Sequence, residues 1–232
     1  MLQRILEPEV MDTLEEAVDY DSMDHGGVNR VFVDDLLAAL GEQETPRHGR
    51  WDILDVGTGT AQIPIELCRR GIDCRVDAID LSEQMLNVGR RNVGRTGLTG
   101  TIILTKADAK QTTFGDASFD VVMSNSIIHH IPEPIMVLRE MVRVLRPGGL
   151  LFVRDLMRPE NSQVVDVLVS TYAGDENDHQ RQMFQDSLHA ALTIHEIQQL
   201  LNDCDLPGGW ATQTTDRHWT IEGRCPKAMS RI

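Results

Sequence analysis

Two glycines one residue apart, Gly57 and Gly59, directly follow an apolar run over residues 53–56 in this chain of 232 residues. A strand that turns sharply into a helix needs glycine there, because the turn requires positive φ angles and a ligand contacts the bare backbone. The free N–H groups of the next helix, expected over residues 63–70, would lie beside that contact. The third glycine of G-x-G-x-x-G is missing, so this stretch alone indicates a nucleotide-type site no more strongly than an ordinary strand-to-helix turn.

A carboxylate stands at the end of the next expected strand, residues 75–79. Asp80 follows Asp55 by 25 residues, close to the spacing of about 20 between a glycine-rich turn and a ribose-binding acid. A carboxylate accepts hydrogen bonds from both ribose hydroxyls, which an amide or a lysine does less well. Asp80 is therefore predicted to bind a ribose.

Polar side chains also follow three further apolar stretches, expected as strands over residues 101–105, 119–123 and 150–153. They are Asp108, Asn125 and Asp155. Because the carboxyl ends of parallel strands meet at one edge of a sheet, these side chains are predicted to converge with Gly57 and Asp80 on a common site.

Histidines and carboxylates near these strand ends are candidates for proton transfer. His129, His130 and Asp155 are predicted as catalytic groups for a substrate that arrives protonated, and Arg158 as the group that binds an anionic substrate. A plainer alternative, which the sequence favours for the two histidines, is that one of them only packs against a ligand bound at this site or caps a backbone carbonyl. The other histidines lack metal-ligand spacing and the four cysteines form no C-x-x-C pair, so no metal site is predicted.

The elements that must position these residues alternate from residue 53 to residue 155. Short apolar strands joined by helices, here expected over residues 63–70, 82–91 and 134–145, indicate a parallel, doubly wound α/β sheet. A glycine-rich turn is expected over residues 92–100. Later helices are expected over residues 161–172, 180–191 and 193–202, and two closing strands over residues 210–214 and 217–222 as a hairpin.

About fifty residues precede the first strand. A short helix is expected after a capping box formed by Asp12 and Glu15, a second helix over residues 28–40, and a linker over residues 41–50. These helices either cover a cleft or pack on one face of the sheet, and the sequence favours neither. The polar and aromatic run from Asp216 to Trp219 receives no assignment.

Composition limits the class of protein and its partners. With 41% hydrophobic residues the chain suits one globular domain with a small appended cap. A formal net charge of −14 repels nucleic-acid backbones and anionic lipid surfaces. No apolar run approaches the ~18 residues of a membrane span. These features predict a cytoplasmic protein with reduced cysteines, no nucleic-acid partner and no membrane partner.

Several of these stretches together resemble the class I S-adenosylmethionine-dependent methyltransferases. ILDVGTGT at residues 53–60 resembles the first motif of the family, with Ala61 where a third glycine often stands, and Asp80 matches its ribose-binding acid. The Ala-Asp-Ala run at residues 107–109 matches the stretch that meets the adenine. SNSIIHHI at residues 124–131 and LREMVRVLRPGG at residues 138–149 resemble the small-molecule branch. A nicotinamide enzyme has no reason to carry the last two stretches. The resemblance covers residues 51–159.

The resemblance implies a mostly parallel seven-stranded Rossmann-like sheet with a helical cap. Residues 1–50 would form an N-terminal cap segment, and residues 51–232 the methyltransferase domain, in which residues 156–203 add helices to the cap. The implied cofactor is S-adenosyl-L-methionine, with S-adenosyl-L-homocysteine as product. Its predicted binding residues are Tyr20, Asp55, Gly57, Thr58, Gly59, Asp80, Leu81, Ser82, Met85, Asp108, Ala109, Asn125 and Ser126.

The implied activity is transfer of a methyl group to an unidentified small-molecule acceptor by in-line displacement, in a monomer or homodimer. Two alternatives stay open from the residues. One is a non-catalytic S-adenosylmethionine-binding protein, and the other is a nicotinamide-dependent oxidoreductase on the same topology.

Overall fold

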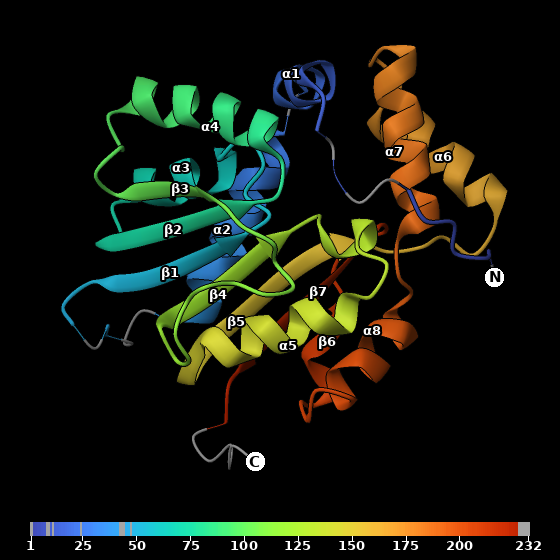
Figure 1. Ribbon diagram of the computed structural model, residues 1–232. Helices are drawn as coiled ribbons and strands as arrows, with labels where there is room; N and C mark the ends of the chain where they lie inside the picture. Colours follow the sequence, from blue (N-terminus) through green and yellow to red (C-terminus); the bar gives the residue numbers. More distant parts are fainter. Residues whose placement is uncertain are drawn as a thin grey trace.

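A single seven-stranded sheet organises the chain, in the order β3-β2-β1-β4-β5-β7-β6 (Figure 1). The computed structural model describes residues 2–7, 10, 12–23, 25–41, 45–46 and 48–226. Strands β1 to β5 are parallel to one another, whereas β7 runs antiparallel to both β5 and β6. This confirms the predicted doubly wound, mostly parallel sheet. The strands are β1 (Trp51–Val56), β2 (Cys74–Asp80), β3 (Ile102–Lys106), β4 (Phe119–Asn125), β5 (Leu145–Leu156), β6 (Ala211–Gln213) and β7 (His218–Arg224).

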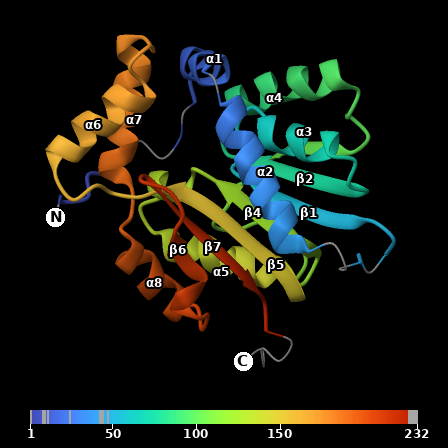
Figure 2. The ribbon, with the colours of Figure 1, turned by 180° about the vertical axis from the view of Figure 1, so that it is seen from behind.

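The central strands read as continuous apolar runs because both of their faces are covered. On one face Leu54 and Val122 pack with α5 (Pro134–Val144) and α8 (Ile194–Asn202). On the other, Ile53 and Val121 pack with α2 (Gly26–Leu40), α3 (Gln62–Arg69) and α4 (Glu83–Thr96). The two helical layers are seen on opposite sides of the sheet in Figures 1 and 2. Strand β1 lies between β2 and β4, so the strand order reverses at β1. A crevice forms at the carboxyl ends of the strands at such a point.

The two helices before the first strand have different places. Helix α2 packs on a sheet face, where the ring of Phe32 meets that of Phe152 edge-on at 5.1 Å, so it belongs to the helical layer. Helix α1 (Leu14–Ser22) instead lies against α4, through Ala17. Its capping box is one residue later than predicted, because Thr13 and Glu16 exchange the two capping hydrogen bonds.

Two predicted boundaries were wrong. Helix α4 continues into the predicted turn at residues 92–100, because buried Val93 keeps its apolar face in the core, and it ends at Thr96, capped by Gly97 with φ +74°. Strand β5 begins at Leu145, which pairs with Phe119 before the register shifts, so Pro147, Gly148 and Gly149 lie within the strand. Of the predicted linker, residues 42–44 and 47 lie outside the described residues.

The last third of the chain forms helices beyond the sheet edge and closes the sheet. Helices α6 (Ser162–Tyr172) and α7 (Asp178–Ala190) lie together beside the carboxyl end of β5 (Figure 2). A short 3₁₀ turn, Gly208–Trp210, leads into the predicted hairpin of β6 and β7, whose bounds start one residue later than predicted. Within the described part of the chain, no helix combines the length and the apolar character that crossing a bilayer requires.

Candidate functional site

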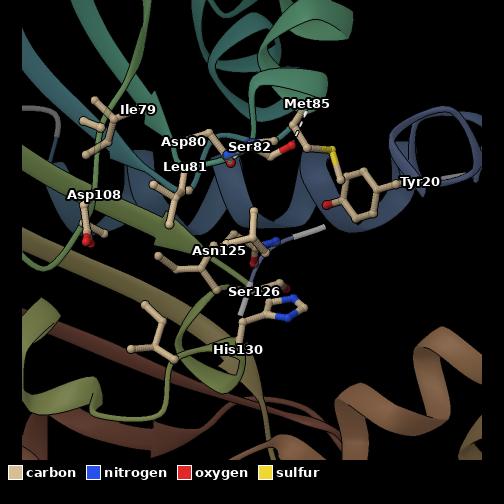
Figure 3. A pocket seen from close by; sticks show the side chains of 17 residues that line it. Tyr20, Ile79, Asp80, Leu81, Ser82, Met85, Asp108, Asn125, Ser126 and His130 are labelled. Atoms are coloured by element: carbon tan, nitrogen blue, oxygen red, sulfur yellow. Dashed lines mark hydrogen bonds between the residues drawn. The ribbon is translucent and has the colours of Figure 1, made fainter. Parts of the chain in front are cut away.

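A pocket of ≈ 110 Å³ opens where the carboxyl ends of β1, β2, β3 and β4 meet. Figure 3 shows side chains from several of these strand ends, with Tyr20 of α1 approaching from the opposite side. Most of the predicted cofactor-binding residues line this pocket, namely Tyr20, Gly57, Gly59, Asp80, Leu81, Ser82, Met85, Asp108, Ala109, Asn125 and Ser126. Asp55 and Thr58 line a smaller pocket that shares Tyr20, Gly57 and Asn125 with the first.

The glycine turn has the expected positive φ angles, +74° at Gly57 and +54° at Gly59. A Cβ added at Gly57 would come within 2.0 Å of Ile127 Cγ2. Gly57 is therefore required by the packing of its own chain, in addition to any ligand contact. At Gly59 the nearest atom to an added Cβ is Tyr20 Cε1 at 3.6 Å, so this position borders open pocket space. Ala61, where a third glycine was expected, is also left-handed, with φ 64°.

The Asp80 carboxylate ties the glycine turn to the end of β2. Its Oδ2 accepts a hydrogen bond from the Gly59 N–H at 2.8 Å, and its Oδ1 accepts one from the Ser82 N–H at 2.8 Å. Burial raises the pKa of Asp80, and these backbone donors partly oppose that shift. Each carboxylate oxygen accepts more than one hydrogen bond, so Asp80 can still receive two hydroxyl groups from a ligand.

Four buried polar atoms at the ends of β1 and β4 and in the glycine turn have no hydrogen-bond partner within the described residues: Asp55 Oδ2, Thr58 Oγ1, Thr60 Oγ1 and Asn125 Oδ1. An unsatisfied buried polar group costs about 1–3 kcal/mol. Burial, with a contribution from Asp80, raises the pKa of Asp55 to about 7. These groups are suited to a polar ligand that supplies the missing hydrogen bonds.

Asp108 and Tyr20 border the pocket in different ways. Asp108 Oδ1 accepts the Lys110 N–H at 2.9 Å and lies 3.2 Å from its ammonium, and 42% of the Asp108 side chain is exposed. It therefore stands at the rim. Burial and the neighbouring carboxylates of Asp80 and Asp55 raise the pKa of Tyr20 to about 12, which keeps its hydroxyl protonated as a donor.

A second, larger cavity of ≈ 270 Å³ lies between α1, α2, α6 and α7. It shares Tyr20, Asn125, Ser126 and His130 with the first pocket, so the two spaces meet at these four residues. Its other lining residues are apolar (Val28, Leu156, Met183, Phe184) and polar (His25, His129, Glu176, Arg217, His218, among others).

The predicted catalytic residues form one cluster, but only the histidines face a cavity. His129 lines the large cavity and His130 lines both. Asp155, with no exposed surface, lies behind them: its Oδ1 is 2.5 Å from His129 Nδ1, and its Oδ2 accepts the His129 backbone N–H at 3.1 Å. Burial alone would lower the pKa of His129, but Asp155 outweighs it and raises that pKa. Asp155 lines neither cavity, so its predicted catalytic role, which stays a prediction, would have to act through His129.

The predicted substrate-binding role of Arg158 does not fit its position. Arg158 is 7% exposed and lines neither cavity. Its Nη2 donates to Glu196 Oε1 at 2.7 Å and its Nη1 to the Ala191 carbonyl at 3.0 Å. The guanidinium therefore links α8 to the end of α7, and its positive charge is paired with the Glu196 carboxylate.

Two groups of residues near the cavities were not predicted. Glu7 Oε1 lies 3.2 Å from His130 Nδ1 and 3.5 Å from His129 Nε2, and burial raises the Glu7 pKa. The Arg217 guanidinium lies 3.3 Å above the ring of Tyr172 in the wall of the large cavity. The Tyr172 hydroxyl donates to Asp216 Oδ2 at 2.7 Å, which explains part of the unassigned run at residues 216–219.

Comparison with known proteins gives one family and two kinds of relatives. Residues 54–153 match the methyltransferase domain family. The ubiquinone/menaquinone biosynthesis C-methyltransferase of Saccharophagus degradans is 29% identical over 152 residues, covering 64% of this chain and 59% of that protein. The protein of the same name from Vibrio campbellii is 31% identical over 160 residues, covering 67% and 58%. The chain thus spans just under three-fifths of the length of these relatives.

Solved structures share the fold across almost the whole chain. A SAM-dependent methyltransferase from Aquifex aeolicus has a TM-score of 0.67 at 20% identity, covering 91% of this chain and 98% of that one. A putative S-adenosyl-L-methionine-dependent methyltransferase from Methanococcus maripaludis has a TM-score of 0.72 at 16% identity, covering 97% and 99%. These likenesses confirm the Rossmann-like fold.

Proposed function

We propose that this chain, whose residues 54–153 match the methyltransferase domain family, transfers a methyl group from S-adenosylmethionine to a small-molecule acceptor. The observation that carries this proposal is the junction of the two cavities at Tyr20, Asn125, Ser126 and His130. A donor in the smaller pocket and an acceptor in the larger cavity would meet there without crossing solvent.

The smaller pocket fits an adenosyl amino acid on the chemistry of its donors and acceptors. We propose that Asp80 binds the ribose hydroxyls, since both of its oxygens keep accepting capacity at the end of β2. The orphaned Asp55 Oδ2 and Asn125 Oδ1 would accept from the amino-acid part. Asp108 and Ala109 would meet the adenine at the pocket rim.

When bound, the cofactor supplies a methyl group that its sulfonium has already activated. The protein then has to hold the acceptor in line with it and exclude water, which contributes roughly 7–11 kcal/mol to lowering the barrier. We assign the exclusion of water to the apolar wall formed by Leu156, Met183 and Phe184. The rings of His129 and His130 would contact the acceptor, and Asp155 would fix the orientation of the His129 ring through Nδ1.

A quinone-related aromatic ring is the acceptor that we propose to test first. The C-methyltransferases of Saccharophagus degradans and Vibrio campbellii are named for ubiquinone and menaquinone biosynthesis. A cavity lined by apolar side chains and several imidazoles suits a flat ring that bears hydroxyl groups. The predictions of a cytoplasmic location and of a monomer or homodimer remain proposals. The prediction of no nucleic-acid partner also remains a proposal, and the net charge of −14 supports it.

The test combines binding with turnover. S-adenosylhomocysteine and NAD are titrated separately against thermal unfolding, and we expect stabilisation by the first only, because a ligand that binds the native state raises its stability. Labelled S-adenosylmethionine is then incubated with the protein and a panel of hydroquinones, phenols and a metabolite extract. Stabilisation by NAD alone would refute the family cofactor for this chain. Stabilisation by S-adenosylhomocysteine without label transfer to any acceptor would favour a non-catalytic binding protein.

A further inference from the structure

Three side chains with metal-binding atoms converge at the wall of the large cavity. Glu7, His129 and His130 offer one carboxylate oxygen and two imidazole nitrogens, all within 4.8 Å of one another. The carboxylate comes from the segment that precedes α1, and both histidines come from the 3₁₀ turn Ile128–His130 that follows β4. His129 is buried, and the other two are largely buried.

The spacing of these atoms matches that of ligands around one ion. Ligand atoms at about 2.0–2.1 Å from a tetrahedral zinc ion lie about 3.4 Å from one another. Glu7 Oε1 lies 3.5 Å from His129 Nε2 and 3.2 Å from His130 Nδ1. The 3.5 Å distance to His129 is longer than a good N–H···O hydrogen bond, and the 3.2 Å distance to His130 is at the upper end of that range. One carboxylate oxygen thus stands near both ring nitrogens, in a position suited to sharing an ion with them.

A carboxylate behind the His129 ring fixes its orientation, as is usual for a histidine that binds a metal. Asp155 Oδ1 contacts His129 Nδ1 at 2.5 Å and also accepts the Leu156 N–H at 2.6 Å, so the ring is fixed with Nε2 directed at Glu7. Metal-bound histidines usually donate their second N–H to such a carboxylate, which sets the tautomer and the ring orientation.

Glu7 is also held in place by its own segment. Arg4 donates from Nε to the Ala190 carbonyl at 2.7 Å and from Nη2 to the His129 carbonyl at 3.0 Å. The Ile5 N–H donates to the His189 carbonyl at 3.1 Å. The Arg4 cation lies close to the cluster, but the Glu7 and Asp155 carboxylates together exceed its charge, so the surroundings still favour a divalent cation.

From this geometry we propose that Glu7, His129 and His130 bind a divalent first-row transition-metal ion, with Glu7 Oε1, His129 Nε2 and His130 Nδ1 as ligands. Two imidazoles and a carboxylate are ligands that Zn²⁺ and Fe²⁺ accept. Three protein ligands leave at least one position for water or substrate, and both histidines line the large cavity. Ion binding at this site does not depend on the proposed methyl transfer.

The experiment uses the full chain without a polyhistidine tag, stripped with a chelator and then titrated with Zn²⁺ by calorimetry. Bound zinc is counted after gel filtration, and Co²⁺ absorption in the visible range reports the ligand geometry. We expect one ion per chain in the wild type. Glu7→Gln and His130→Gln should each weaken Zn²⁺ binding at least 100-fold, and Asp155→Asn should weaken it by about 10–100-fold, as for other residues that orient a ligand.

Two variants serve as matched controls. Glu176→Gln changes a carboxylate in the same cavity wall, and His179→Gln changes an exposed histidine bound to Asp19 at 2.8 Å. Both should keep the wild-type Zn²⁺ affinity. Circular dichroism of every variant shows whether the fold is intact, and S-adenosylhomocysteine binding by the wild type tests the methyltransferase proposal separately. Absence of stoichiometric zinc, or equal zinc affinity in the wild type and a folded Glu7→Gln variant, would overturn the metal site.

Discussion

Replacing Asp80 by alanine tests the cofactor pocket at its most connected residue. The Asp80 carboxylate accepts the Gly59 and Ser82 N–H groups, each at 2.8 Å, and borders the pocket with its remaining lone pairs. Alanine removes the acceptor for both backbone donors and for the proposed ribose hydroxyls. Two measurable quantities, stability and cofactor affinity, should therefore change together.

The affinity change follows from the loss of a hydrogen-bond partner to buried hydroxyls, about 1–3 kcal/mol. At 25 °C this weakens S-adenosylhomocysteine binding by about 5–150-fold. Because Asp80 is only partly buried, water can reach the two N–H groups that lose their acceptor. We therefore expect the free energy of unfolding to fall by about 1–3 kcal/mol in total, which is less than if both donors were left without any partner.

The assay is isothermal titration of S-adenosylhomocysteine into the wild type, Asp80→Ala and a control, with urea unfolding of each. Asp77→Ala is a suitable control because Asp77 lies on the same strand, pairs with Arg75 at 3.4 Å and lines neither cavity. It should retain the wild-type affinity. If folded Asp80→Ala binds S-adenosylhomocysteine within twofold of the wild type, Asp80 does not hold the ribose and the proposed orientation of the cofactor is wrong.

Three further predictions address other parts of the molecule. Burial raises the pKa of Asp55 from 3.8 to about 7, so between these two pH values the native state binds more protons than the unfolded state. The stability that Asp55 contributes is therefore fully present below pH 4 and falls by up to about 4 kcal/mol as the pH rises through 7. Urea unfolding at pH 5 and pH 8 should show about 2–3 kcal/mol of this loss in the wild type and a smaller loss in Asp55→Asn; equal losses would contradict it. Arg146→Met leaves buried Asp120 without its 2.7 Å partner and should lower the free energy of unfolding by about 2–4 kcal/mol. The affinity for S-adenosylhomocysteine should stay unchanged, since the pair lies at the end of the sheet away from the pocket. A changed affinity would show that the two ends of the sheet are coupled. Gly57→Val should abolish cooperative unfolding, because its Cβ would lie 2.0 Å from Ile127 Cγ2, whereas Gly59→Ala should stay folded at a cost of about 1–2 kcal/mol; a folded Gly57→Val protein, seen by circular dichroism, would disprove this packing argument.

The edge of the sheet could be predicted from the sequence because it follows from local patterns. Apolar runs of strand length, each ending in a polar residue, determine both the strands and the side on which Asp80 and Asn125 emerge. The helix boundary at residues 92–100 was missed because Gly94 suggests a turn, while burial of Val93 extends α4 beyond it.

Burial and long-range pairing explain the errors within the site. Asp155 and Arg158 follow a strand end in the same way as Asn125, but nothing local in the sequence reveals that one lies beneath His129 and the other pairs with Glu196. Glu7 belongs to a segment without helix or strand periodicity, so its approach to residues 129 and 130 has no signal in one sequence. Tertiary packing determines these positions.

The hydrogen bonds of Arg4 have a consequence for how the molecule is assembled during synthesis. Arg4 is bound to a carbonyl 186 positions later in the chain, so its segment cannot be fixed in place until residue 190 has been made. The five parallel strands can pair before that bond forms, since the last of them ends at residue 156. The wall that carries Glu7 is then completed late, by a segment translated long before its partners.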